Sequence, residues 1–100
     1  MTLRIGHLTY KLKWRKRHAH DGQTLFGSID HRKQVLVLDN ALRNSAERVD
    51  EVLLHEVLHG ISHTHVLNID ESVCNALAVA LTDFFQQREN HDLFTTYGSR

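Results

Sequence analysis

Several features that restrict the class of a protein are scarce or missing in this chain of 100 residues. It contains no proline, repeat or low-complexity tract, so nothing indicates a linker between domains. Its single cysteine cannot form an internal disulfide, which favours a reducing compartment. No apolar run approaches the roughly 20 residues of a transmembrane helix, and the N-terminus lacks the apolar core of a signal peptide. These absences predict one domain over residues 1–100, located in the cytoplasm and without a membrane partner.

Net charge is also missing, because 12 basic and 12 acidic side chains balance at pH 7. Such a chain has no global attraction to nucleic acid. The exception is KLKWRKRH, residues 11–18, where basic side chains surround Trp14 in a pattern that can grip single-stranded nucleic acid. A solvated strand end is the interpretation we favour. Docking of an acidic partner and binding of nucleic acid remain as alternatives.

Alternating polar and apolar residues predict β-structure in the first half of the chain. Residues 3–12 alternate, which favours one strand. Two β-rich runs follow at 24–30 and 34–40, with the polar turn His31-Arg32-Lys33 between them. That arrangement is typical of a hairpin, so we expect an antiparallel sheet of about three strands.

Two helices are expected in the second half of the chain. The first should begin near Asn44-Ser45, with Asn44 as its cap and Glu47 completing a box-like arrangement. Apolar residues cover nearly its full circumference, which is normal for a buried helix. These residues are Val49, Val52, Leu53, Leu54, Val57, Leu58 and Ile61. A second helix is predicted over about 70–88, where apolar residues recur at helical spacing.

His55, Glu56 and His59 spell H-E-x-x-H within the first expected helix. Residues four apart share one helix face, so both imidazoles can point at one metal ion, and this ligand type suits zinc. Glu56 lies about 100° further around the helix, beside the ion rather than on it. There its carboxylate can take a proton from a water that zinc activates and deliver it to a leaving amine. The pattern is typical of zinc peptidases.

A catalytic zinc needs a third protein ligand, and the sequence offers three candidates. His63 follows His59 by four residues, so an unbroken helix would put it a full turn past the metal. His65 has the spacing of the metzincin motif, although Ser62 stands where that motif has glycine and no methionine follows. Glu71 opens the second expected helix and could fold back to complete a His₂Glu set.

The segment ESVCNALA, residues 71–78, resembles the E-x-x-A-N-x-F-A segment that follows H-E-x-x-H in the ImmA/IrrE family of zinc metallopeptidases. GSID, QVLVLDN and LLHEVLHGI also resemble the strand, strand, helix order of small, often phage-encoded members. The resemblance runs from about Gly27 to Asn90, with its specific motifs confined to 53–78.

This resemblance implies His55, His59 and Glu71 as ligands of one Zn²⁺ ion per chain and Glu56 as the catalytic base. It also implies a bacterial host cell as the setting and a host or phage regulator as a substrate or partner. Two departures stand out. Cys74 replaces the usual alanine, and the loop between His59 and Glu71 is short, which leaves less wall for a substrate cleft.

The sequence therefore predicts an α+β fold, a minimal zincin-like domain. A short antiparallel sheet should pack on the H-E-x-x-H helix, with a second helix bearing the third ligand. The expected function is zinc-dependent hydrolysis of peptide bonds in a protein or peptide, held along the sheet strand nearest the cleft. The alternative is a non-proteolytic, zinc-stabilised module that binds a partner protein. The short cleft wall favours that module, whereas Glu56 favours the enzyme, because a structural site needs no base.

Other residues are candidates for supporting roles. Three could stabilise an oxyanion: Tyr10, His91 and Tyr97. Three could orient a ligand imidazole: Asp50, Asp70 and Asn75. The H-x-H pair His18 and His20 is better explained as exposed loop histidines than as a metal site. Cys74 is expected to be a small core residue, with metal ligation or a redox role as the weaker alternative.

Overall fold

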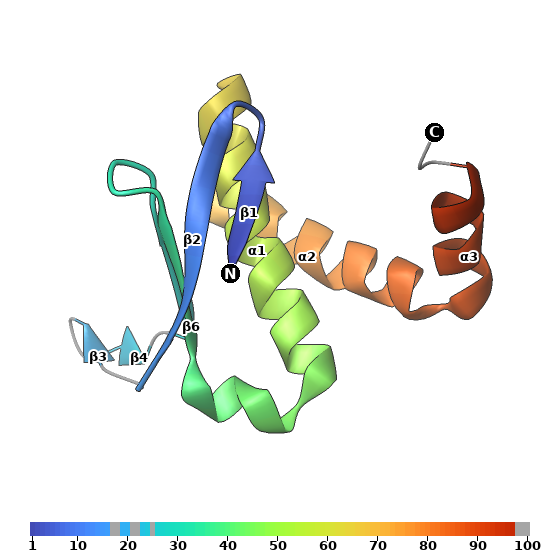
Figure 1. Ribbon diagram of the computed structural model, residues 1–100, viewed down its shortest axis with the longest axis horizontal. Coiled ribbons are helices and arrows are strands. Elements are labelled where there is room, and N and C mark those ends of the chain that lie inside the picture. The colour runs from blue at the N-terminus through green and yellow to red at the C-terminus, as the bar shows by residue number, and fades with distance from the viewer. Residues whose placement is uncertain (17–18, 21–22, 25, 98–100) are drawn as a thin grey trace.

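The computed structural model describes residues 1–16, 19–20, 23–24 and 26–97. The main sheet contains β1 (Thr2–Ile5), β2 (Leu8–Arg15), β5 (Gly27–Asp30) and β6 (Val35–Asp39). Two short strands pair separately, β3 (Ala19–His20) and β4 (Gln23–Thr24). A 3-10 helix, η1 (Asn40–Asn44), precedes the helices α1 (Ala46–His65), α2 (Glu71–Gln86) and α3 (Arg88–Tyr97). The sheet lies on one side of α1, and α2 leads away from α1 to α3 (Figure 1). The expected α+β class is confirmed.

The main sheet is mixed, so the expectation of an antiparallel sheet was wrong. Its four strands are ordered β1-β2-β6-β5. The outer pairs are antiparallel, but β2 and β6 run parallel, with Lys11 opposite Val35 and Arg15 opposite Asp39. Two hairpins therefore lie side by side. Whether β2 and β6 pair parallel or antiparallel depends on contacts between residues distant in sequence. The alternation of polar and apolar residues within one strand carries no information about this.

The single strand expected over 3–12 is a hairpin. Its turn contains Gly6, whose φ of +61° lies in the left-handed region that glycine adopts without a steric penalty. A Cβ atom on Gly6 would lie 2.5 Å from Cγ2 of Thr64, so the turn also packs closely against the end of α1. Buried side chains fall on odd numbers in β1, as at Ile5, and on even numbers in β2, as at Tyr10. The prediction of one continuous strand overlooked this shift of the buried positions from odd to even residue numbers.

The hairpin predicted from the runs at 24–30 and 34–40 is confirmed, although its first strand begins only at Gly27. β5 and β6 pair antiparallel, with Asp30 opposite Val35. In the turn, Oδ1 of Asp30 accepts a hydrogen bond from the backbone N–H of Lys33 at 2.9 Å. β5 is an edge strand, and its one strand neighbour among the described residues is β6.

The first helix begins slightly later than expected. α1 starts at Ala46 with Ser45 as its N-cap, so the capping role predicted for Asn44 was wrong. The residues before it form η1, because Asp39 caps that shorter helix. Oδ1 of Asp39 accepts a hydrogen bond from the N–H of Ala41 at 2.8 Å.

α1 packs between the sheet and α2. On the sheet side, the core consists of Leu36, Leu38 and Leu42, with Val52 and other half-buried residues of α1 against them. On the other side, Leu58 packs with Cys74 and Ala78 of α2. Each fully buried leucine contributes roughly 1.5–3 kcal/mol. Most of the apolar residues of α1 are half-buried, so the helix is enclosed on two sides rather than all round.

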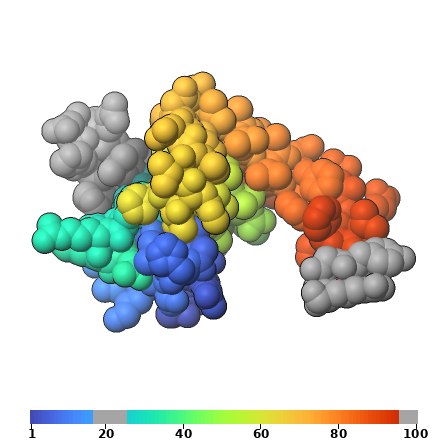
Figure 2. All heavy atoms as spheres, turned by 90° about the horizontal axis from the view of Figure 1, so that it is seen from above, coloured from blue at the N-terminus to red at the C-terminus, as the bar shows by residue number. Residues whose placement is uncertain are grey.

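Beyond these cores, α2 and α3 project away from the sheet and α1, as Figure 2 shows. We call these two helices together, residues 71–97, the α2–α3 arm. It exposes several large apolar side chains: Val73, Leu77, Val79, Phe84, Phe85, Leu93 and Phe94. Three of its aromatic rings, those of Phe84, Phe85 and Phe94, meet edge to face. Within the described residues, no helix has both the length and the apolar character needed to cross a membrane.

Candidate metal centre

His55 and His59 meet on one face of α1. They lie one helical turn apart, and their Nε2 atoms are 3.1 Å from each other. The two side chains are 15% and 27% exposed, so packing restrains both rings while leaving them accessible. Both imidazoles present the same nitrogen to one point, as their spacing predicted.

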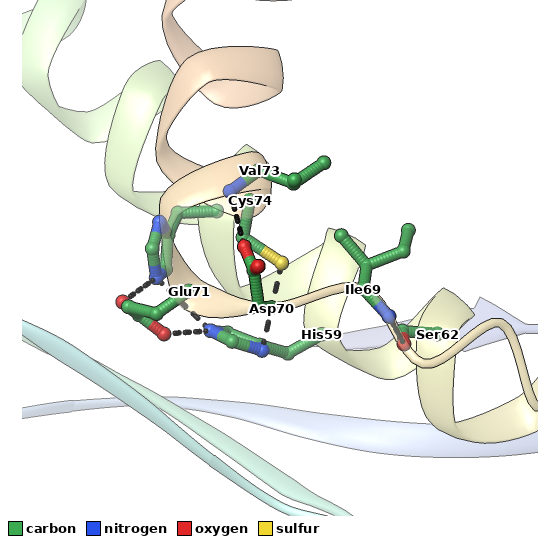
Figure 3. Close-up of polar contacts among 8 residues, drawn as sticks. His59, Ser62, Ile69, Asp70, Glu71, Val73 and Cys74 are labelled. Atoms are coloured by element: carbon green, nitrogen blue, oxygen red, sulfur yellow. Dashed lines mark hydrogen bonds and ion pairs between the residues drawn. The ribbon is translucent and has the colours of Figure 1, made fainter.

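Glu71 approaches the same point from the first turn of α2. Asp70 caps that helix, with its Oδ1 accepting a hydrogen bond from the N–H of Val73 at 2.8 Å. Oε1 of Glu71 lies 2.8 Å from Nε2 of His55, and Oε2 lies 2.9 Å from Nε2 of His59 (Figure 3). One potential ligand atom from each of the three residues lies within 4.8 Å of the other two. His55, His59 and Glu71 could therefore hold a metal ion.

A tight chain reversal brings Glu71 back to α1. Val66 and Asn68 have φ values of +54° and +56°, and these left-handed residues turn the backbone sharply. Such a conformation is rare for a β-branched residue, and hydrogen bonds to Ser62 stabilise it here. The carbonyl of Ser62 accepts from the N–H of Val66, and its hydroxyl oxygen accepts from the N–H of Ile69 at 3.1 Å.

The donor set and its dimensions fit zinc. Two imidazole nitrogens and one carboxylate form the His₂Glu set of many catalytic zinc sites. Ligand atoms about 2.0–2.2 Å from a tetrahedral ion are roughly 3.3–3.6 Å apart. The nitrogen–nitrogen distance of 3.1 Å and the nitrogen–oxygen distances of 2.8 and 2.9 Å are shorter than this by a few tenths of an ångström. Because the Glu71 side chain is 64% exposed, solvent reaches the group.

Glu56 lies beside this group rather than within it. Its side chain is buried against β5, where a Cβ on Gly27 would lie 3.3 Å from Cγ of Glu56. Burial raises the pKa of this carboxyl from 4.5 to about 7; Glu71 acts in the same direction and His59 opposes it. A carboxyl with this pKa exchanges protons readily near neutral pH.

A cleft of about 360 Å³ has Glu56 in its lining together with His55 and Glu71, two of the three residues that could hold a metal ion. Its lining comes from the start of β5, from α1 and from α2: Phe26, Gly27, Glu51, Val52, His55, Glu56, Glu71, Asn75 and Ala78. A ligand in this cleft could therefore contact Glu56, His55 and Glu71 together. Glu51 and Phe26 were not singled out from the sequence, because nothing local indicates that they lie at this site.

Comparison of the chain with protein-family models, curated proteins and solved structures found no match. The likeness of residues 53–78 to ImmA/IrrE peptidases thus remains a prediction from motifs.

Cys74 contacts His59 on the side of the ring that faces away from Glu71. Its Sγ atom lies 3.6 Å from Nδ1 of His59, on the far side of the ring from Glu71 (Figure 3). Sγ is therefore not placed to bind an ion held by Nε2. Cys74 is fully buried, as predicted for a core residue. Its contact with His59 was not anticipated, although its position one turn after Glu71 was the available signal.

The other two candidates for the third ligand lie outside the group. α1 continues through His65, so both histidines are helical rather than part of the loop leaving the helix. His63 stacks on His31, with ring centroids 4.1 Å apart and an interplanar angle of 3°. His31 in turn bonds through Nδ1 to the hydroxyl of Tyr10 at 3.1 Å. Burial lowers the pKa of His31, and the charges of His63 and His59 lower it further.

The candidates for supporting roles are scattered. Tyr10 is buried against His31, while His91 and Asp50 line a second cavity between α1 and the α2–α3 arm. The side chain of Tyr97 lies outside the described part of the structure. Asn75 lines the cleft, whereas Asp70 serves as the α2 cap. None of these residues has a hydrogen bond to a ligand imidazole among the described contacts.

The basic segment follows the interpretation that we favoured as far as it is described. In β2, Lys11, Lys13 and Arg15 are exposed, while Trp14 is half-buried. The guanidinium of Arg43 lies 4.5 Å from the centre of the Trp14 ring. The aromatic face is thus already covered from within the protein. Residues 17 and 18, and the side chain of His20, lie outside the described part.

Proposed function

We propose that this protein is a zinc-dependent peptidase, in which His55, His59 and Glu71 hold the ion and Glu56 transfers protons. The observation that carries the proposal is the placement of Glu56. A buried carboxyl with a pKa of about 7 lines the same cleft as His55 and Glu71, two of the three residues that could hold a metal ion. A purely structural site would not need this carboxyl, whose ionised form burial disfavours.

The chemistry divides between the ion and the protein. A zinc ion bound here would lower the pKa of a water molecule to near 7 and polarise the carbonyl of a peptide bond. Glu56 in its ionised form accepts a proton from that water. Once protonated, it can donate the proton to the amine that leaves. A pKa near the working pH suits both roles, because neither form of the carboxyl is then rare.

The edge strand β5 offers a binding surface for an extended peptide. Gly27 lies at the start of β5 and lines the cleft with Glu56. The strand pairs with β6 on one side, which leaves its other edge without a strand partner in the described residues. A peptide adding to that edge would be held by backbone hydrogen bonds close to the metal-binding group. A host or phage regulator with an extended segment would be such a substrate, in keeping with the ImmA/IrrE resemblance.

Metal content is the first test. Elemental mass spectrometry of the purified protein should give one zinc per chain. Glu71→Ala should lose the metal, while Glu56→Gln and His65→Ala should keep it. Zinc retained in full by Glu71→Ala, or absent from the wild-type protein even after reconstitution, would contradict the proposed centre.

Hydrolysis is the second test. The zinc-loaded protein is incubated with a diverse mixture of unfolded peptides, and new termini are identified by mass spectrometry. Cleavage by the wild-type protein and its absence with Glu56→Gln at equal zinc content would support the peptidase. Cleavage that persists with Glu56→Gln would rule out the role of this carboxyl and point to a contaminating protease.

A binding module is the second candidate, and the apolar surface of the α2–α3 arm favours it. Val79, Leu93 and Phe94 are 53%, 53% and 50% exposed, and large exposed apolar surface often marks a protein interface. In this case zinc would stabilise the fold, and Glu56→Gln would leave partner binding intact. A partner captured equally by the wild-type protein and Glu56→Gln, without cleavage of that partner, would favour the module.

A further inference from the structure

Nδ1 of His59 has Cys74 Sγ as its one hydrogen-bond partner among the described contacts. Leu58 and Ala78 lie in the same buried apolar cluster as Cys74, and Leu81 packs against that cluster. The thiol itself is 0% exposed, so no water competes for the contact. Burial raises the pKa of the thiol, and the negative charges of Glu71, Glu56 and Asp70 raise it further.

We infer that Cys74 is a positioning residue, whose thiol orients the His59 imidazole for metal binding and bonds to it both with and without the ion. This inference rests on the proposed zinc centre. It concerns how the ligand is held and names no further ligand. Residues bonded to the second nitrogen of a ligand histidine commonly fix its ring orientation and tautomer.

The thiol suits this role because it can both donate and accept. Without metal, Nε2 of His59 lies 2.9 Å from a carboxylate oxygen of Glu71 and carries the proton of that contact. In the neutral ring Nδ1 is then an acceptor, and the S–H of Cys74 donates to it. If Nε2 instead bound a zinc ion, its proton would be released to solvent and Nδ1 would take up one proton from solvent. The new N–H then donates to the sulfur, and the charge of the ring is unchanged.

Few other side chains could serve both states equally. A carboxylate only accepts, so it would bond to the metal-bound tautomer alone. Alanine, the residue usual at this position in the family that the sequence resembles, offers neither a donor nor an acceptor. A serine hydroxyl can do both, as the thiol does. Serine is therefore the substitution that should preserve the role, and alanine the one that should remove it.

The test compares zinc affinities, measured by competition with a fluorescent chelator at pH 7.5. Cys74→Ala should bind zinc about 10-fold or more weakly than the wild-type protein, and Cys74→Ser should stay within about threefold of it. Leu81→Ala is the matched control, because it opens space beside the same cluster without touching His59. It should leave the affinity unchanged. Circular dichroism of each metal-free variant verifies that it is folded.

A second readout reports the contact directly. In the zinc-loaded wild-type protein, long-range proton–nitrogen NMR should show the His59 ring proton on Nδ1, exchanging slowly with water. In Cys74→Ala the same proton should exchange faster, and Cys74→Ser should restore slow exchange. A residue that only fills space would not produce this pattern.

Each outcome decides between the two proposals. Equal zinc affinity in the wild-type protein and Cys74→Ala, or an equal loss with Leu81→Ala, would overturn the positioning role while leaving the metal centre intact. A wild-type protein that binds no zinc would overturn both. Zinc binding that weakens in Cys74→Ala and recovers in Cys74→Ser, without cleavage of any peptide, would support the positioning role and reject the peptidase.

Discussion

Replacing Glu56 with glutamine should stabilise the metal-free protein at pH 8. The Glu56 side chain is 8% exposed, and its burial is the main reason that its pKa rises from 4.5 to about 7. One pKa unit corresponds to about 1.4 kcal/mol, so ionising this carboxyl costs about 3 kcal/mol more in the folded protein than in the unfolded chain. Glutamine has nearly the same shape and no charge, so it removes this cost.

The pH dependence follows from the two pKa values. Below pH 4.5 the carboxyl is protonated in both the folded and the unfolded state, and the cost is absent. Between 4.5 and about 7 the unfolded chain releases its proton first, so stability falls as pH rises. Above that range the carboxyl is ionised in both states, and the full loss of stability has been reached. The gain from Glu56→Gln should therefore approach about 3 kcal/mol at pH 8 and stay below about 1 kcal/mol at pH 5.

Urea unfolding in the presence of EDTA, followed by Trp14 fluorescence at both pH values, measures these differences. Glu51→Gln is the matched control, because it removes the same charge from an exposed position on the same helix and the same cleft. Its effect should stay within about 0.5 kcal/mol. An equal gain from Glu56→Gln at pH 5 and pH 8, or no gain at pH 8, would refute the reasoning that burial of this carboxyl destabilises the fold.

Three further substitutions have defined outcomes. Asp70→Ala removes the cap of α2, so urea unfolding should show a loss of about 1 kcal/mol, and zinc competition should show weaker binding as the first turn loosens. The pKa of His31 is lowered by burial, so the contribution of this residue to the stability of the metal-free protein should fall as pH drops below 6.5, where the unfolded chain takes up a proton first. His31→Phe removes this contribution, so urea titrations should show the variant gaining stability relative to the wild-type protein between pH 7.5 and pH 5. A Cβ on Gly27 would lie 2.7 Å from Cγ1 of Val52, so Gly27→Ala should lower the unfolding free energy by about 1–3 kcal/mol, whereas Ser28→Ala should have little effect.

Sequence was sufficient for the parts of the centre that depend on local spacing. The i, i+4 spacing of His55 and His59 requires only that the segment be helical, which its apolar residues indicated. Asp70 before Glu71 is a typical helix start, so the approximate position of α2 could also be predicted. The burial of Glu56 was not predictable in the same way. It depends on Gly27 allowing β5 to approach α1 closely, and that contact joins residues distant in sequence.

The errors in the sheet have the same origin. Hairpins form between neighbouring segments, so the turn between β5 and β6 could be recognised from its polar residues. The parallel pairing of β2 with β6 joins two hairpins, and alternation within a strand carries no information about the direction of its neighbour. The start of α1 was misjudged for a more local reason. Asp39 caps a short 3-10 helix that extends to Asn44, so α1 begins only after that residue.

Glu71 meets the two imidazoles and His65 does not, and the course of the chain explains this difference. Both residues follow His59 at spacings known from zinc peptidases, so spacing alone left the choice open. The deciding feature is the residue at which α1 ends. Because the helix continues to His65, that side chain lies about 15 Å along the helix axis from His55. Only after the reversal at Val66 does the chain return, and the first acidic side chain of α2 then meets both imidazoles. Shortening α1 by a turn would change which residue could reach the ion while leaving the H-E-x-x-H motif unchanged.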